Sequence, residues 1–112
     1  MINLNYERNI QMIAGTYGEK EQLVKTAEET AELTQAALKR RADLSDNDTS
    51  AETLRASREA LIGEIADVLI MCEQLIYLEG CEGDVLRMID EKLTRQIERI
   101  RANRRKAVTA AQ

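Results

Sequence analysis

The stretch Glu59–Leu75, EALIGEIADVLIMCEQL, decides the fold of this 112-residue chain. It has one glycine, no proline and a dense apolar content, which predicts a helix packed into a core. On a helical wheel its apolar residues cover a wide arc, with Glu64 inside that arc and Asp67 just beyond its edge. A helix that is apolar around most of its surface is typical of the centre of a bundle.

The composition favours helices throughout the chain. Glu, Lys, Arg, Ala and Leu dominate, while proline, tryptophan and phenylalanine are absent. We therefore expect a single all-α domain over residues 1–112. It is a helical bundle of about four helices per chain, and dimerisation completes it because one chain can hardly cover so apolar a central helix.

Turn and cap residues divide the chain into these helices. Gly15 and Gly18 end a short N-terminal helix within residues 1–16, and Ser50 or Thr49 is the N-cap of the third helix. The segment GCEGD separates the last two helices, and residues 106–112 form a frayed tail. The expected helices cover about Asn5–Ala14, Glu19–Arg41, Ala51–Glu79 and Asp84–Arg105. The apolar face expected for the second of them consists of Leu23, Val24, Ala27, Ala31, Thr34 and Leu38.

Several classes of function are disfavoured by charge and by missing residue types. A net charge of −4 argues against a general nucleic-acid binder, and no apolar run is long enough to cross a membrane. The first ten residues, MINLNYERNI, lack the basic and apolar regions of a signal peptide, and we expect a cytoplasmic protein. Cys72 and Cys81 form no CxxC pair and histidine is absent, so we expect reduced cysteines in or near the core and no zinc site.

Paired carboxylates are the feature that calls for a chemical explanation. Glu64 and Asp67 are spaced i and i+3, as are Glu29 and Glu32 on the preceding helix, with Glu28 beside them. If these two helices pack antiparallel, four or five carboxylates converge on one pocket, and only a multivalent cation offsets that repulsion. Oxygen ligands suit a hard ion, so the pattern predicts Mg²⁺, with Mn²⁺ as a substitute.

Each segment also has a plainer interpretation. EETAE, residues 28–32, is by itself typical of a solvated helix face, and a buried carboxylate can simply pair with an arginine. On the last helix, Lys92, Arg95 and Arg99 line one edge of an apolar stripe, where long basic side chains commonly cover a core. The combination of the two acidic motifs favours a site over these alternatives.

EETAE followed by EIAD, residues 64–67, resembles the paired EExxE and ExxD motifs of the MazG-like nucleoside triphosphate pyrophosphohydrolases. This all-α superfamily also includes dimeric dUTPases and phosphoribosyl-ATP pyrophosphatases. The likeness extends to YGEKEQLVKTAEETAELTQAALKRR, EIADVLIMCEQL and KLTRQIERI, and so spans about residues 17–100. The resemblance implies a helical bundle that forms a homodimer or homotetramer, and a Mg-dependent enzyme that splits a (d)NTP into the monophosphate and pyrophosphate.

The resemblance also implies a role for each matching residue. Its metal ligands are Glu29, Glu32, Glu64 and Asp67, and the residue that orients or deprotonates the attacking water is Glu28. The residues that bind the substrate phosphates are Lys92 and Arg95.

The sequence departs from the family pattern in three places. The spacer between the motifs is long, Gly63 replaces an acidic residue of many relatives, and Ala60 replaces a lysine of some. These departures leave the metal ligands in place and bear on how the phosphates are fixed.

Two alternatives to this function stay open. One is a non-catalytic helical interaction or regulatory module, which explains the amphipathic faces but gives no reason for Glu64 and Asp67. The other lies within the superfamily, namely a phosphoribosyl-ATP pyrophosphatase or a dUTPase-like enzyme. The preferred base and sugar are not evident from three tyrosines and no other aromatic residue.

Overall fold

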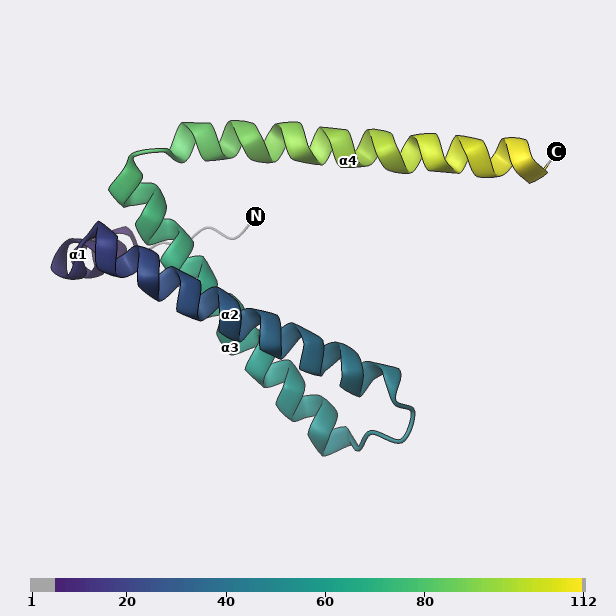
Figure 1. The fold of residues 1–112 in the computed structure, drawn as a ribbon, viewed down its shortest axis with the longest axis horizontal. Coiled ribbons are helices and arrows are strands. Elements are labelled where there is room, and N and C mark those ends of the chain that lie inside the picture. Colours follow the sequence, from purple (N-terminus) through teal and green to yellow (C-terminus); the bar gives the residue numbers. More distant parts are fainter. Residues whose placement is uncertain (1–5, 112) are drawn as a thin grey trace. The chain divides into compact units, whose positions relative to one another are not determined.

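The computed structural model describes residues 6–111, and within that range the chain is helical without strands. Four helices follow one another: α1 (Glu7–Tyr17), α2 (Glu19–Ser45), α3 (Ala51–Glu79) and α4 (Glu82–Ala111) (Figure 1). The all-α prediction is confirmed. The chain divides into two compact units, one ending at Gly80 and the other beginning at Cys81.

The first helix is longer than predicted at its C-terminal end. Gly15 lies inside α1 rather than in a turn, and Gly18 ends the helix with φ of 86°, a conformation that favours glycine. The N–H of Gly18 donates to the carbonyl of Ala14 at 2.8 Å, and α2 starts at the next residue. The predicted start at Asn5 lies outside the described residues.

α2 continues four residues beyond the predicted end at Arg41. Side chains support the extra turn, because Lys39 pairs with Asp43 at 2.9 Å and the Ser45 hydroxyl donates to the carbonyl of Arg41 at 2.8 Å. The prediction of a loop starting at Ala42 is therefore wrong.

α3 begins and ends where the sequence predicts. The Ser50 hydroxyl accepts a hydrogen bond from the N–H of Thr53 at 3.1 Å, which confirms Ser50 as the N-cap. Gly80 ends the helix in the left-handed conformation, with φ of 60°.

α4 exceeds its predicted bounds at both ends. Its first turn includes Glu82, and its end extends through the alanine-rich segment after Arg105 to Ala111, where a frayed tail was expected.

The helices of residues 6–111 lack the hydropathy of membrane-spanning helices. Although α2, α3 and α4 are long, none of the described helices is apolar enough to cross a bilayer.

α2 and α3 lie side by side and antiparallel, and α1 packs against both (Figure 1). Gln22 near the start of α2 bonds to Gln74 near the end of α3 at 2.7 Å. At the other end of the pair, Arg40 donates to the carbonyl of Leu54 at 2.7 Å and to the Ser57 hydroxyl at 3.2 Å. The two helices therefore meet along a face that is largely polar.

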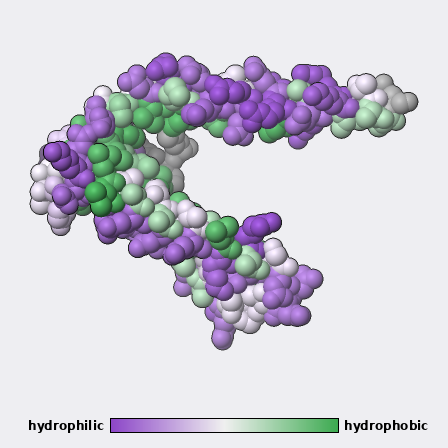
Figure 2. All heavy atoms as spheres, viewed as in Figure 1, coloured by the Kyte–Doolittle hydropathy of each residue, from purple (hydrophilic) through white to green (hydrophobic). Residues whose placement is uncertain are grey.

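Few apolar side chains are fully buried in the described chain. The buried hydrophobic residues are Ile10, Ala14 and Met71. The predicted apolar face of α2 points outward, with Leu23, Val24 and Leu38 about half exposed or more, and Figure 2 shows hydrophobic residues at the surface of the α1–α3 unit. Cys72 is exposed and Cys81 half-buried, so the expected burial of the cysteines is wrong for Cys72.

Candidate metal centre

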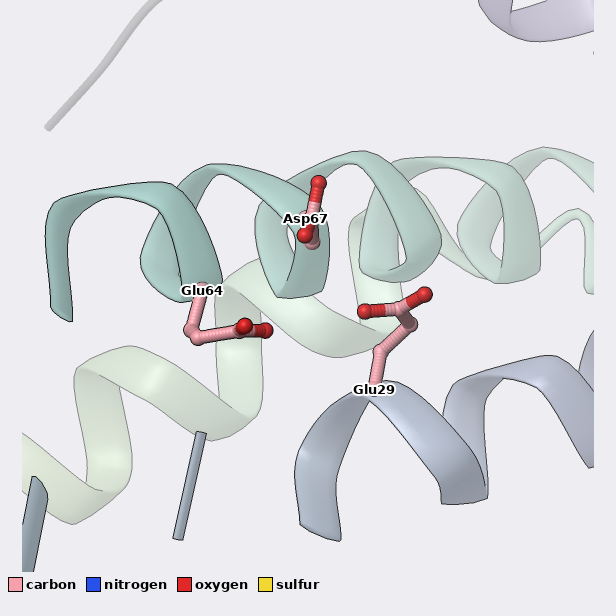
Figure 3. A group of neighbouring side chains, drawn as sticks. All are labelled: Glu29, Glu64 and Asp67. Atoms are coloured by element: carbon pink, nitrogen blue, oxygen red, sulfur yellow. The ribbon is translucent and has the colours of Figure 1, made fainter. Parts of the chain in front are cut away.

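The packing of α2 on α3 brings three of the four predicted metal ligands together. Glu29 lies on the face of α2 that meets α3, and Glu64 and Asp67 lie one turn apart on α3. One carboxylate oxygen from each of the three lies within 4.8 Å of the others, and Figure 3 shows Glu29 and Glu64 extending toward each other. We call Glu29, Glu64 and Asp67 the acidic cluster.

Two members of the acidic cluster have oxygens that lack a donor. Glu29 is 8% exposed, and its Oε2 is buried without a hydrogen-bond partner, as is Oε2 of Glu64. A buried carboxylate oxygen without a partner costs free energy. A bound cation removes that cost, so the donor set fits Mg²⁺, which is bound through oxygen.

Glu64 and Asp67 form no ion pair with the basic side chains of residues 6–111. The plainer interpretation, in which a buried carboxylate pairs with an arginine, therefore finds no support at these two positions. Asp67 is exposed, so its carboxylate is open to solvent on the outer side of the cluster.

Glu32 lies close to the acidic cluster without belonging to the group of three. The negative charges of Glu29 and Glu64 raise the pKa of Glu32, with smaller contributions from partial desolvation and a hydrogen bond with Glu29. The neighbouring negative charges therefore disfavour the ionised form of Glu32.

Glu28 lies outside the acidic cluster, on the solvent side of α2. Its side chain is 60% exposed and its Oε2 lies 3.7 Å from Nζ of Lys25. Its assignment as the residue that handles the attacking water stays a prediction.

Lys92 and Arg95 are exposed residues of α4 and belong to the second unit. Along α4 they stand one turn apart and so share a face. Their assignment to the substrate phosphates stays a prediction as well.

Sequence reasoning missed Lys25, which is the basic residue in contact with the acidic cluster. Its Nζ lies 3.1 Å from Oε1 of Glu29, one helical turn further along α2. The i, i+4 spacing of Lys25 and Glu29 was the signal that could have found it.

A second polar group, also missed, closes the far end of the α2–α3 pair. Asp43 is 7% exposed, its Oδ1 pairs with Lys39, and its Oδ2 is buried without a partner. The hydrogen bond from Lys39 holds the pKa of Asp43 below its usual value, and Ser57 contributes in the same direction. Because Asp43 has cations beside it, this group is balanced in charge, unlike the acidic cluster.

No protein-family model, no curated protein and no solved structure matches this chain. The acidic cluster and the sequence pattern that predicts it are therefore the features of this chain that bear on its function.

Proposed function

We propose that the protein is a Mg-dependent nucleoside triphosphate pyrophosphohydrolase that splits a (d)NTP into the monophosphate and pyrophosphate. The observation that carries the proposal is the acidic cluster, in which three carboxylates meet and two have buried, unpartnered oxygens. The residues that bind the metal are Glu29, Glu64 and Asp67, with Glu32 as a fourth ligand close by.

A metal held by Glu29, Glu64 and Asp67 would supply Lewis-acid chemistry, which would neutralise phosphate charge and make water more acidic. The chain's own residues then have three tasks. Glu28, an exposed residue next to Glu29 on α2, accepts the proton of the attacking water. Lys92 and Arg95, which share a face of α4, bind the phosphates and stabilise the charge on the leaving pyrophosphate.

The proposal includes a homodimer or homotetramer. Only three apolar residues are buried among those described, whereas large apolar side chains of α1, α2, α3 and α4 are exposed. On α4 the stripe Leu86, Ile89, Leu93, Ile97 and Ile100 repeats at spacings of three and four residues, which suits packing against another helix. A second copy of the chain is the partner that covers these faces in the proposal.

The test is a screen of all common NTPs and dNTPs with Mg²⁺, in which ion-exchange chromatography separates pyrophosphate from orthophosphate. We expect a monophosphate and pyrophosphate in equal amounts from at least one nucleotide, and loss of turnover with EDTA. Glu64→Gln is the matched variant and should be inactive. Absence of turnover with every nucleotide in both Mg²⁺ and Mn²⁺ would contradict the proposal.

A helical interaction module is the second candidate, favoured by the same exposed apolar faces. A Mn²⁺ titration followed by electron paramagnetic resonance separates the two functions. A pure interaction module does not bind the ion, whereas the proposed enzyme binds it through Glu29, Glu64 and Asp67.

A further inference from the structure

Lys25 is the basic residue that contacts the acidic cluster. Its Nζ lies 3.1 Å from Oε1 of Glu29 and 3.7 Å from Oε2 of Glu28. No other lysine or arginine within residues 6–111 forms an ion pair with Glu29, Glu64 or Asp67.

The contact satisfies only part of the cluster. Lys25 engages Oε1 of Glu29, while Oε2 of Glu29 and Oε2 of Glu64 stay buried without a donor. One monovalent ammonium therefore does not neutralise the charge of the carboxylates, and a divalent ion in the same place neutralises more of it.

The Lys25 side chain can also move away from Glu29 at little cost in stability. It is 51% exposed, whereas its partner Glu29 is 11% exposed at the side chain. An i, i+4 pair with one half-exposed member is weak, so its loss costs the fold little.

We propose that Lys25 is a positioning residue that exchanges with the metal, and this inference rests on the proposed function. In the metal-free protein its ammonium occupies Oε1 of Glu29 and competes with the divalent cation. When the cation binds, the ammonium is displaced and pairs with a phosphate oxygen of the nucleotide, one helical turn from Glu29. Lys25 thus opposes metal binding and favours substrate binding.

The substitution Lys25→Met tests both parts of the proposal, opposition to metal binding and support of substrate binding, because it keeps the length of the side chain and removes its charge. Without nucleotide, the dissociation constant for Mn²⁺, measured by electron paramagnetic resonance of the free ion, should fall about threefold to tenfold. With Mn²⁺ saturating, KM for the best nucleotide should rise about threefold or more. These opposite signs distinguish exchange of Lys25 with the metal from a purely structural role. In a structural role, loss of Lys25 disorders Glu29 and weakens the binding of both Mn²⁺ and the nucleotide.

Two control variants accompany it. Lys25→Arg keeps the charge and should stay near wild type for both ligands. Lys20→Met removes the same charge from an exposed position of α2 outside the cluster and should change each constant less than twofold. Circular dichroism establishes that each variant is folded, and Lys25→Gln replaces Lys25→Met if the latter is not.

Unchanged or weaker Mn²⁺ binding by the folded uncharged variant overturns the exchange. Tighter Mn²⁺ binding with an unaltered KM overturns the contact with the phosphate. Both failures differ from failure of the proposed function, in which the wild-type protein itself binds no Mn²⁺.

Discussion

Asp67 is the residue of the acidic cluster at which a metal ligand and a structural carboxylate make opposite predictions. It is exposed and has no basic partner among residues 6–111, so no buried ion pair depends on it. In the proposed enzyme it is indispensable for the chemistry and nearly dispensable for the fold.

We expect Asp67→Asn to lower kcat/KM on the order of a hundredfold or more, because a misplaced metal misaligns water and substrate. With EDTA its stability should equal or exceed that of wild type, since one source of like-charge repulsion is gone. Activity assays and thermal unfolding in EDTA check both statements. Glu73→Gln, on the same helix, is the control and should alter neither, whereas an unfolded Asp67→Asn protein would show a structural role.

Glu32 gives a prediction that depends on pH. Its pKa in the folded protein is raised above 4.5 by Glu29 and Glu64, so the folded state holds the proton more tightly than the unfolded state does. The ionised form of Glu32 therefore lowers the free energy of unfolding. This destabilisation is absent below pH 4.5, where Glu32 is protonated in both states, and it develops as the pH rises through the pKa of the folded state.

Glu32→Gln removes that penalty. With EDTA the variant should match wild type below about pH 4 and have the higher Tm at pH 7. Thermal unfolding across this pH range checks the expectation, and Glu21→Gln on the same helix is the control. A lower Tm for Glu32→Gln at pH 7 would refute the like-charge interpretation.

At the level of the elements, polar contacts align α2 with α3. Gln74 is 1% exposed and Gln22 is 5% exposed. The side-chain carbonyl of Gln74 accepts the hydrogen bond from Gln22, and the Nε2 of Gln74 donates to Sδ of Met71 at 3.5 Å. Gln22 lies seven residues before Glu29, and Gln74 lies seven residues after Asp67. Both amides therefore lie on the helix-packing face, two turns from the acidic cluster.

Removing one amide should cost more than removing both. Gln74→Leu strands the buried amide of Gln22 and should lower the free energy of unfolding by about 1–3 kcal/mol. The double variant Gln22→Leu/Gln74→Leu should recover most of that loss, because no unpaired polar group is left. Urea unfolding measures each value, with exposed Gln35→Leu as the control; strict additivity of the two substitutions would show that the bond does not couple them.

At the level of the whole molecule, the proposed function predicts that metal binding and folding are linked. In the proposed enzyme the divalent ion binds the folded acidic cluster, which the unfolded chain does not assemble, so the ion should raise stability by mass action. Mg²⁺ at tenfold above its dissociation constant should add about 1.4 kcal/mol to the free energy of unfolding. Thermal unfolding with millimolar Mg²⁺ and with EDTA measures the difference, which Glu64→Gln should abolish; an unchanged midpoint in wild type counts against the site.

The exposed apolar faces predict self-association. Light scattering at micromolar concentration should give at least twice the chain mass of 12.7 kDa. Leu93→Glu and Ile97→Glu place charges on the apolar stripe of α4, where these side chains are 60% and 46% exposed, and should reduce the mass to that of one chain. Thr94→Glu, outside the stripe, is the control, and a wild-type monomer would sink this prediction.

The sequence alone determined the elements that local interactions specify. The all-α class and both ends of α3 follow from helix-forming residues, the Ser50 cap and Gly80. It also predicted that Glu29, Glu32, Glu64 and Asp67 would meet if the two helices pack antiparallel, because carboxylates spaced by one turn share a face of their helix. The structure brings three of the four together, without Glu32.

Only the tertiary structure decided which faces meet. Hydropathy pointed to Leu23, Val24 and Leu38 as the packing face of α2, yet α2 meets α3 through Gln22 and Glu29. Within one helix, periodicity separates the faces but does not say which neighbour each one contacts, since that depends on residues distant in sequence. The spacing of Lys25 allows contact with both Glu28 and Glu29, and the structure shows that the shorter contact, 3.1 Å, is with the buried Glu29.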